Sequence, residues 1–346
     1  MKKISILIFS LALSLAINAQ DIHFSQFYMA PLNLNPALTG VMNCQQRLAG
    51  NYRNQWASVL RDKAFQTYQV AYDAKIPVGR YDYFGIGGTL WGDKAGSLDV
   101  HTNQLSVDFA YAKKMGGYRK SANYLVMGAE LGLAQRGANT QDARWPNQAD
   151  NGNYNPNLPS NENIFQRDNF IYPDITAGLL WFSVLDENSN WYIGGAYDHI
   201  NRANQSFTNT EFRPLYSKFT IHAGGEFRTN DRITMLPGVV TFLQGPYMQI
   251  NGGTSFRFLL GGSKKSTEAI QFGAWARLGN QYENGVLLDA IILSTRFDYS
   301  QFSIGFSYDA NVSSLRPATK GNGSFEFSLQ YKVCGNESRG VYCPNF

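Results

Sequence analysis

Beyond residue 19 the sequence has no run of 18 uninterrupted apolar residues, and its mean hydropathy is negative. A helix that crosses a bilayer needs about 20 largely apolar residues, so this part of the sequence argues against a helical membrane protein. Charged residues are also scarce, at 16% of the chain, and Lys and Arg form no dense basic stripe. We therefore expect no nucleic-acid partner.

The chain also lacks the short motifs of common catalytic and metal sites. It has no G-x-S-x-G, phosphate loop or zinc-protease motif, and its four His stand at no metal-ligand spacing. His222 shares a strand face with Glu226 and Arg228, where we expect a solvated luminal side chain. We interpret the glycines of "GIGGTLWG" as strand residues, and "DENSNW" as a hairpin turn rather than a calcium loop. Neither an enzyme nor a cofactor is expected.

Residues 1–19 have the pattern of a secretory signal peptide. Lys2 and Lys3 precede the apolar run Ile4 to Ile17, and Ile17-Asn18-Ala19 resembles a small-residue cleavage site. A retained membrane helix is the alternative, but the run is short for it. No lipobox cysteine follows, so we expect no lipoprotein.

The rest of the chain favours strands. Aromatic residues make up 14% of it and Gly numbers 33, a composition that suits pleated surfaces with many turns. In "SFEFSLQYKV", Phe325, Phe327 and Leu329 fall on one face, and Glu326 and Ser328 on the other.

Similar alternation recurs along the chain in runs of about ten residues, with no composition shift that would mark a domain boundary. The runs predict fourteen strands in one domain, near residues 47–56, 65–73, 82–92, 101–112, 122–135, 171–183, 190–199, 216–228, 232–241, 246–260, 268–279, 285–294, 299–309 and 323–333.

The connections between these strands differ in length. The three long ones, near 136–170, 200–215 and 310–322, are the fifth, seventh and thirteenth, so antiparallel strands place them all on one side. Short turns on one side and long loops on the other are typical of outer-membrane barrels. We therefore predict an all-β fold, a transmembrane antiparallel up-and-down β-barrel of about 14 strands. A soluble β-sandwich is the alternative, but its outer faces should be polar.

The loop from Gly137 to Asn169 contains "NQADNGNYNPNLPSNEN", which is too polar to pack by itself. It is either a surface loop or a contact for a partner outside the cell.

Three cysteines follow the leader, so they meet an oxidising compartment. Cys44 precedes the first strand and Cys334 follows the last, which places both near the periplasmic rim of a closed barrel, and Cys343 lies in the short tail. One bridge and one free thiol, with the pairing open, stands beside the alternative of no bridge.

Four segments together resemble the PorP/SprF family of outer-membrane proteins associated with type IX secretion and gliding. They are "QDIHFSQFYMAPLNLNPALTG" at 20–40, "NYRNQW" at 51–56, "YDANVSSL" at 308–315 followed by "GSFEFSLQY", and "CPNF" at 343–346. The family-motif positions are Tyr52, Arg53, Gln55, Trp56, Tyr308, Asp309 and Asn311.

The resemblance implies an outer-membrane barrel that helps a cognate adhesin with a type B C-terminal domain to be exported or held at the surface. It implies gliding motility as one process served, and periplasmic type IX machinery and outer-membrane lipid as further partners. The alternative is a passive or ligand-binding pore for a small molecule.

The apolar, Pro-interrupted stretch after the leader fits neither a strand nor a long helix. Irregular backbone is tolerated where protein or water satisfies it, so the stretch can plug the periplasmic mouth or dock a protein there, and we expect it to combine both roles. We expect Phe24, Phe27 and Tyr28 to be apolar anchors for a partner, and Asn33 and Asn35 to form turn hydrogen bonds before Pro36. Packing against the barrel alone is the other interpretation.

The chain then divides into four parts. They are a signal peptide (1–19), an irregular N-terminal periplasmic segment (20–46), an outer-membrane barrel (47–333) and a periplasmic C-terminal tail (334–346).

Overall fold

The structure is a computed structural model. It describes residues 21–96, 98–117, 121–139, 143–150, 153–159, 166–186, 189–208, 211–263, 266–281, 285–335 and 343–344. The proposed signal peptide, the tip of the "DENSNW" turn and the last two residues lie outside this part of the chain.

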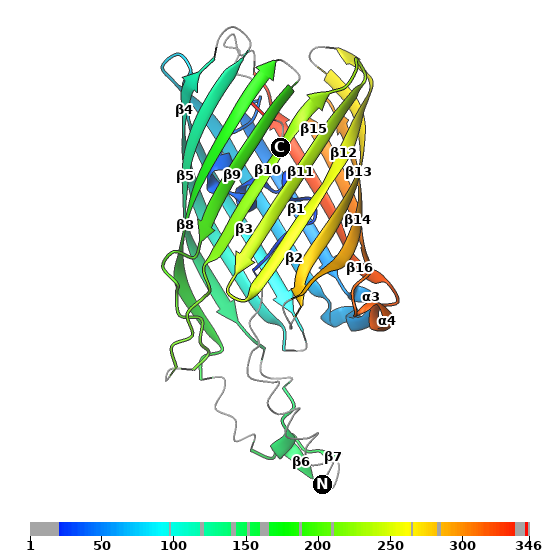
Figure 1. Cartoon of the computed structure of the whole chain (residues 1–346). Coiled ribbons are helices and arrows are strands. Elements are labelled where there is room, and N and C mark those ends of the chain that lie inside the picture. Colours follow the sequence, from blue (N-terminus) through cyan, green and yellow to red (C-terminus); the bar gives the residue numbers. More distant parts are fainter. Residues whose placement is uncertain are drawn as a thin grey trace.

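Fourteen antiparallel strands close into one barrel, in which the first strand pairs with the last (Figure 1). The strand count and the fold class predicted from the sequence are confirmed. Apolar and polar residues alternate along each strand, and this repeat sets which face turns outward. The strands are β1 (Gln46–Gln55), β2 (Phe65–Val78), β3 (Asp82–Ala95), β4 (Val100–Gly116), β5 (Ala122–Gly137), β8 (Asn169–Asp186), β9 (Ser189–Asp198), β10 (Lys218–Arg228), β11 (Ile233–Gln244), β12 (Tyr247–Ser263), β13 (Ser266–Gln281), β14 (Gly285–Tyr299), β15 (Phe302–Asn311) and β16 (Asn322–Val333).

The long connections all emerge at the same end of the barrel, as predicted from their odd places in the order of connections. We call it the long-loop end and the other the short-turn end. The connection between β5 and β8 carries η5 (Pro146–Gln148) and a small hairpin of β6 (Ala149–Asp150) and β7 (Asn153–Tyr154). The short helices α3 (Ala57–Leu60), η4 (Arg61–Lys63) and α4 (Arg316–Thr319) lie at this end too (Figure 1).

Large apolar side chains cover the outside of the barrel. Leu105, Leu133 and Ile171 are each more than 60% exposed, and Phe306 and Phe327 also point outward. Monomeric soluble proteins rarely expose so much apolar surface, whereas a barrel in lipid must. No helix in the described part of the chain is long and apolar enough to cross a membrane.

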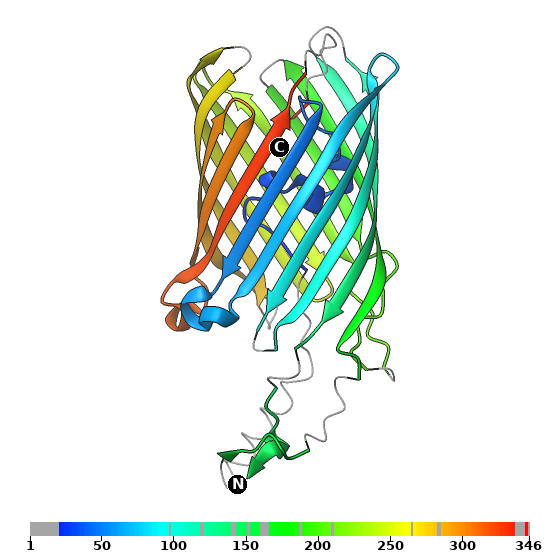
Figure 2. The ribbon, with the colours of Figure 1, turned by 180° about the vertical axis from the view of Figure 1, so that it is seen from behind.

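The inside of the barrel is polar and filled. Ser106, Asp108, Glu326, Ser328 and Gln330 are all buried there. Residues 21–45, which we call the plug segment, run through the lumen in three short helical turns, drawn in dark blue inside the barrel in Figure 2. These turns are η2 (Phe27–Met29), α2 (Pro31–Leu34) and η3 (Pro36–Leu38).

Candidate functional site: the plug segment and its luminal contacts

Local sequence explains why the plug segment is broken into short turns. Pro31 and Pro36 each stand at the first position of a helical turn, where the missing N–H is not needed. Asn35 precedes η3 in extended conformation, and its side-chain oxygen accepts the Ala37 N–H at 2.8 Å. The predicted turn bond of Asn35 is thus present, while Asn33 is a half-buried residue of α2.

The half of the plug segment nearer the short-turn end packs into an apolar cluster. Leu38 and Val41 are fully buried against Tyr83, Tyr124 and Phe182 of three barrel strands. Such burial stabilises the folded state by about 1.5–3 kcal/mol for each large apolar side chain.

Glycines in the wall make room for this approach. A Cβ at Gly85 would collide with the Thr39 carbonyl oxygen, and one at Gly128 would collide with the Ala37 backbone. Gly85 belongs to "GIGGTLWG", so the interpretation of these residues as strand glycines is correct, and close contact with the plug segment is the reason.

An ion pair ties the plug segment to the first hairpin. The guanidinium of Arg47 donates two hydrogen bonds of 2.9 Å to the Asp73 carboxylate, and both side chains are almost completely buried. Asp73 also accepts the Gly40 N–H at 2.7 Å, and Arg47 donates to the Leu38 carbonyl at 3.3 Å. A bidentate pair of this kind fixes geometry as well as charge.

At mid-height the plug segment meets the opposite wall. The Asn35 amide donates to the carbonyls of Leu179 and Gly195, at 3.1 Å each, and lies 3.0 Å from Nε2 of His222. His222 is fully buried. Our expectation of a solvated luminal His222 is therefore wrong, because the plug segment occupies the space that water would fill.

Aromatic side chains hold the next turn. Phe27 and Tyr28 both pack on Trp275 of β13, with ring centroids 5.5 Å apart in each pair. The Tyr28 hydroxyl lies 3.1 Å from the Ser294 hydroxyl. Burial raises the pKa of Tyr28 to about 12, so this hydroxyl stays protonated.

A four-residue charge cluster receives the plug segment near the long-loop end. The Glu326 carboxylate accepts the backbone N–H groups of Ser25 and Gln26 at 2.6 and 2.9 Å. Arg53 donates to Glu326 at 2.9 Å, and Arg277 donates to Asp309 at 2.6 Å. Two arginines and two carboxylates therefore balance one another around the Ser25 turn.

The first described residue, Asp21, is held by a second cluster. Its carboxylate lies 2.7 Å from the Lys218 ammonium and 3.3 Å from Nε2 of His199, while Nδ1 of His199 lies 2.8 Å from Asp174. Burial alone would lower the pKa of His199, but the two carboxylates outweigh burial and raise this pKa to about 10. Burial likewise opposes ionisation of Asp21, yet Lys218 and His199 lower the pKa of its carboxyl.

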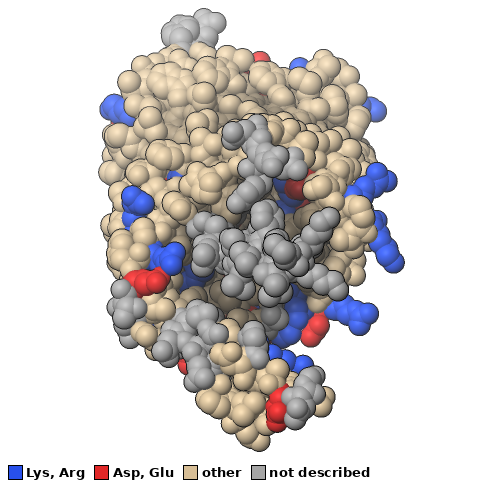
Figure 3. Space-filling model, turned by 60° about the horizontal axis from the view of Figure 1, so that its bottom comes forward, with Lys and Arg blue, Asp and Glu red and all other residues tan. Residues whose placement is uncertain are grey.

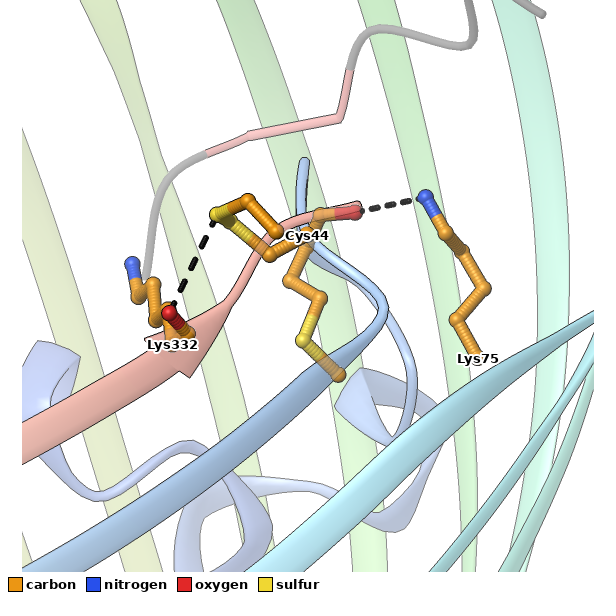
Figure 4. The surroundings of a disulfide bond; sticks show 5 residues. Cys44, Lys75 and Lys332 are labelled. Atoms are coloured by element: carbon orange, nitrogen blue, oxygen red, sulfur yellow. Dashed lines mark hydrogen bonds between the residues drawn. A yellow bond between two sulfur atoms is a disulfide. The ribbon is translucent and has the colours of Figure 1, made fainter. Parts of the chain in front are cut away.

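At the short-turn end the plug segment is fixed covalently. Cys44 forms a disulfide with Cys334, which follows β16, and Cys343 is a buried cysteine outside this bond. Figure 4 shows this bond beside Lys75, whose ammonium donates to the Met42 carbonyl at 3.0 Å. Of the alternatives that the sequence left open, the structure has one bridge, with Cys343 as the thiol outside it.

The family-motif residues fall into two sets by direction. Arg53 and Asp309 point inward and hold the plug segment. Asn311 binds Ser313 and Thr319 and so shapes the last loop. Tyr52 and Tyr308 lie on the outer face, where Tyr52 packs on Phe325 and Tyr308 binds Asn322.

Gln55 and Trp56 end the first strand. Gln55 accepts a hydrogen bond from Arg53 at 3.3 Å, and the Trp56 N–H donates to the Gly323 carbonyl at 2.8 Å. This part of the motif therefore joins the charge cluster to the long-loop end.

A family model described as the type IX secretion system membrane protein PorP/SprF matches residues 16–331. The chain belongs to the PorP/SprF family. A member of a type IX secretion membrane family whose closed barrel is apolar outside is an outer-membrane protein.

The solved structures that resemble the chain are remote. No curated protein matches the chain. The monoaromatic hydrocarbon channel CymD has 12% identity and a TM-score of 0.47, with 93% of this chain and 96% of CymD covered. The Pseudomonas putida toluene transporter TodX has 8% identity and a TM-score of 0.44 over 95% of this chain and all of TodX. CdiB from Acinetobacter baumannii has 8% identity and a TM-score of 0.43 over 83% of this chain, which spans 60% of the length of CdiB.

The six residues that we expected to bind a partner lie inside this PorP/SprF barrel. Four of them are buried, namely Phe24, Phe27, Asn35 and Pro36. The other two, Tyr28 and Asn33, are half-buried in the same segment. The segment also lies deeper than the mouth at which we expected it. Its backbone groups bond to charged side chains near both ends of the lumen, and the Met29 carbonyl between them accepts from the amides of Asn51 and Gln330. A buried backbone group needs a hydrogen-bond partner, and the luminal side chains supply these partners along the segment.

Sequence reasoning missed the residues that receive the plug segment. Asp73, Asp174, Lys218, Arg277 and Glu326 stood out only as occasional charges on the inward face of alternating strands. A charge on a face that otherwise carries Ser, Gln and Gly was the available signal, since a buried charge needs a partner.

Proposed function

We propose that this barrel assists the export or surface attachment of a cognate adhesin with a type B C-terminal domain, and that gliding motility is one process it serves. Membership of the PorP/SprF family supports the secretion role. One observation favours this secretion role over a pore. The plug segment fills the lumen from Asp21 to Cys44.

The filled lumen counts against the alternative of a passive pore. A water-filled channel leaves its luminal polar groups solvated, whereas Asn51, Gln330 and His222 bind plug residues here. A barrel closed in this way suits a protein-binding role better than diffusion of a small solute.

We further propose that the short-turn end faces the periplasm, where the type IX machinery would meet it. Outer-membrane barrels carry short periplasmic turns and long outer loops, and an oxidising periplasm suits the Cys44–Cys334 bridge. Protease added to intact cells should cut within residues 137–169 and spare 229–231. The reverse pattern would contradict this orientation.

The N-terminal segment keeps a partner-binding role in this proposal, under one condition. Phe24, Phe27 and Tyr28 would meet a partner only after the segment leaves the lumen, so partner binding and lumen opening become one event. Ala substitutions at these buried aromatics would also leave cavities, each costing about 3–5 kcal/mol, and would not test binding cleanly.

Deletion of the protein tests the proposed function. We expect loss of surface display of one adhesin, with other secreted proteins retained, and recovery of that adhesin with the tagged barrel in pull-downs from outer membranes, identified by mass spectrometry. Normal adhesin display combined with lost uptake of one small nutrient would favour the pore instead.

A further inference from the structure

A cavity of about 330 Å³ opens at the long-loop end, next to the start of the plug segment. It lies among the starts of β12 and β14, the end of β13 and the loop between β15 and β16, with His23 of the plug segment in its lining. Ligand pockets range from about 300 to 1,000 Å³, so this volume suits a small ligand or one end of a longer one.

The lining combines flat apolar surfaces with side chains that both donate and accept hydrogen bonds. Trp56 and Tyr247 supply aromatic rings, while Gln55, Gln249 and Ser314 supply amide and hydroxyl groups. A sugar ring presents an apolar C–H face together with hydroxyls that each donate and accept, so it complements both features.

Charge in the cavity favours a neutral ligand. Among the described residues that line it, Arg277 and Asp289 carry opposite charges and lie 3.8 Å apart. Arg277 is already engaged by Asp309, and burial with the nearby arginines lowers the pKa of His23 well below its usual range, so His23 is neutral. Figure 3, which brings the long-loop end forward, shows both Lys or Arg and Asp or Glu side chains scattered among uncharged residues on the described surface.

The backbone at the cavity does not suit a peptide. Extended peptides commonly bind by adding to a free strand edge. Here β12 pairs with β11 and β13, and β13 pairs with β14, up to residues that line the cavity. The backbone groups of these strands are therefore already hydrogen-bonded to neighbouring strands, and a ligand in the cavity would be recognised by side chains.

Trp56 also holds a costly backbone conformation. Its φ of 60° lies in the left-handed region, which a bulky non-glycine residue rarely adopts. Strain of this kind concentrates at binding and catalytic sites. Here it sets Trp56 at the cavity, where its ring also packs edge-on against Phe65.

We propose that this cavity, which we call the mouth cavity, binds a neutral oligosaccharide through Trp56, Tyr247, Gln55 and Asp289. The inference does not depend on the proposed secretion role, because it is argued only from the residues that line the mouth cavity. This cavity lies at the opposite end of the barrel from the Cys44–Cys334 bridge.

Array binding followed by calorimetry tests the proposal with the purified full-length barrel in detergent. The glycan array carries neutral hexose, deoxyhexose and N-acetylhexosamine oligosaccharides beside uronic-acid oligosaccharides, and a peptide array runs in parallel. We expect binding to a neutral oligosaccharide, weakened about tenfold or more in Tyr247→Ala, as for loss of an aromatic anchor. Asp289→Asn should weaken it as well.

Tyr154→Ala is the matched control, because Tyr154 is exposed in the β6–β7 hairpin and does not line the mouth cavity. Heat-modifiable mobility verifies that each variant is folded. Absence of any neutral oligosaccharide binding, preference for uronic acids or peptides, or unchanged affinity in both cavity variants would each overturn the proposal.

Discussion

Arg47 and Asp73 are direct cross-strand partners in the first hairpin of the barrel, and together they grip the plug segment at Leu38 and Gly40. One ion pair thus joins two strands of the barrel wall and also binds the plug segment. Folding of the wall and filling of the lumen are coupled through it.

Replacing Asp73 by Ala should therefore destabilise the protein strongly. The Arg47 guanidinium would stay buried without its counter-ion, a change that costs about 3–5 kcal/mol. Lys113→Ala, which removes the exposed partner of Asp82, should change stability little, because a solvated surface ion pair contributes little. Heat-modifiable mobility against temperature compares the two, and equal shifts would contradict the assigned role of Asp73.

Phe327→Arg tests the outward face. Phe327 lies near the middle of β16 and packs on Phe306 outside the barrel, so Arg should cost about 2–4 kcal/mol if the site is near the bilayer midplane. Phe327→Leu should be tolerated. Folding yields in lipid vesicles measure both, and equal yields would argue against a lipid-facing position.

Ser328, the inward-facing neighbour of Phe327, should not tolerate Arg. An open, wet lumen would tolerate Arg at Ser328, but Ser328 is buried and accepts a hydrogen bond from Asn51 at 2.9 Å. Arg would overpack this site, at a cost of about 1–3 kcal/mol or more.

Gly128→Val should displace the plug segment while the barrel still forms. Its side chain would occupy the position of the Ala37 backbone, whereas Gly50→Ala meets nothing nearer than 4.0 Å. Limited proteolysis in detergent should release N-terminal fragments from Gly128→Val and not from Gly50→Ala. Equal protection in both variants would mean that the lumen has room to spare at Gly128.

The contacts of His199 predict a pH dependence. Because its pKa is raised from 6.5 to about 10, its contribution to stability is complete below pH 6.5 and is lost as pH rises through 10. The difference in unfolding temperature between wild type and His199→Gln should shrink across this window. A difference that stays constant from pH 6.5 to 10 would show that the ion pairs of His199 do not stabilise the fold.

Much of the barrel could be predicted from the sequence, because strand alternation and turn spacing are local. The regular "SFEFSLQYKV" shows both faces of β16 by itself. The site could not be predicted in the same way, since Glu326 binds the N–H of Ser25 from 301 positions away. No local pattern connects two such residues, and Pro31 and Pro36 indicated only that their segment was irregular.

Conductance in planar lipid bilayers tests most directly whether the barrel is closed by its own N-terminal segment. The wild-type protein should show no stable channel steps, and a variant that lacks residues 22–40 but keeps Cys44 should show large ones. Equal conductance of the two proteins would contradict the account.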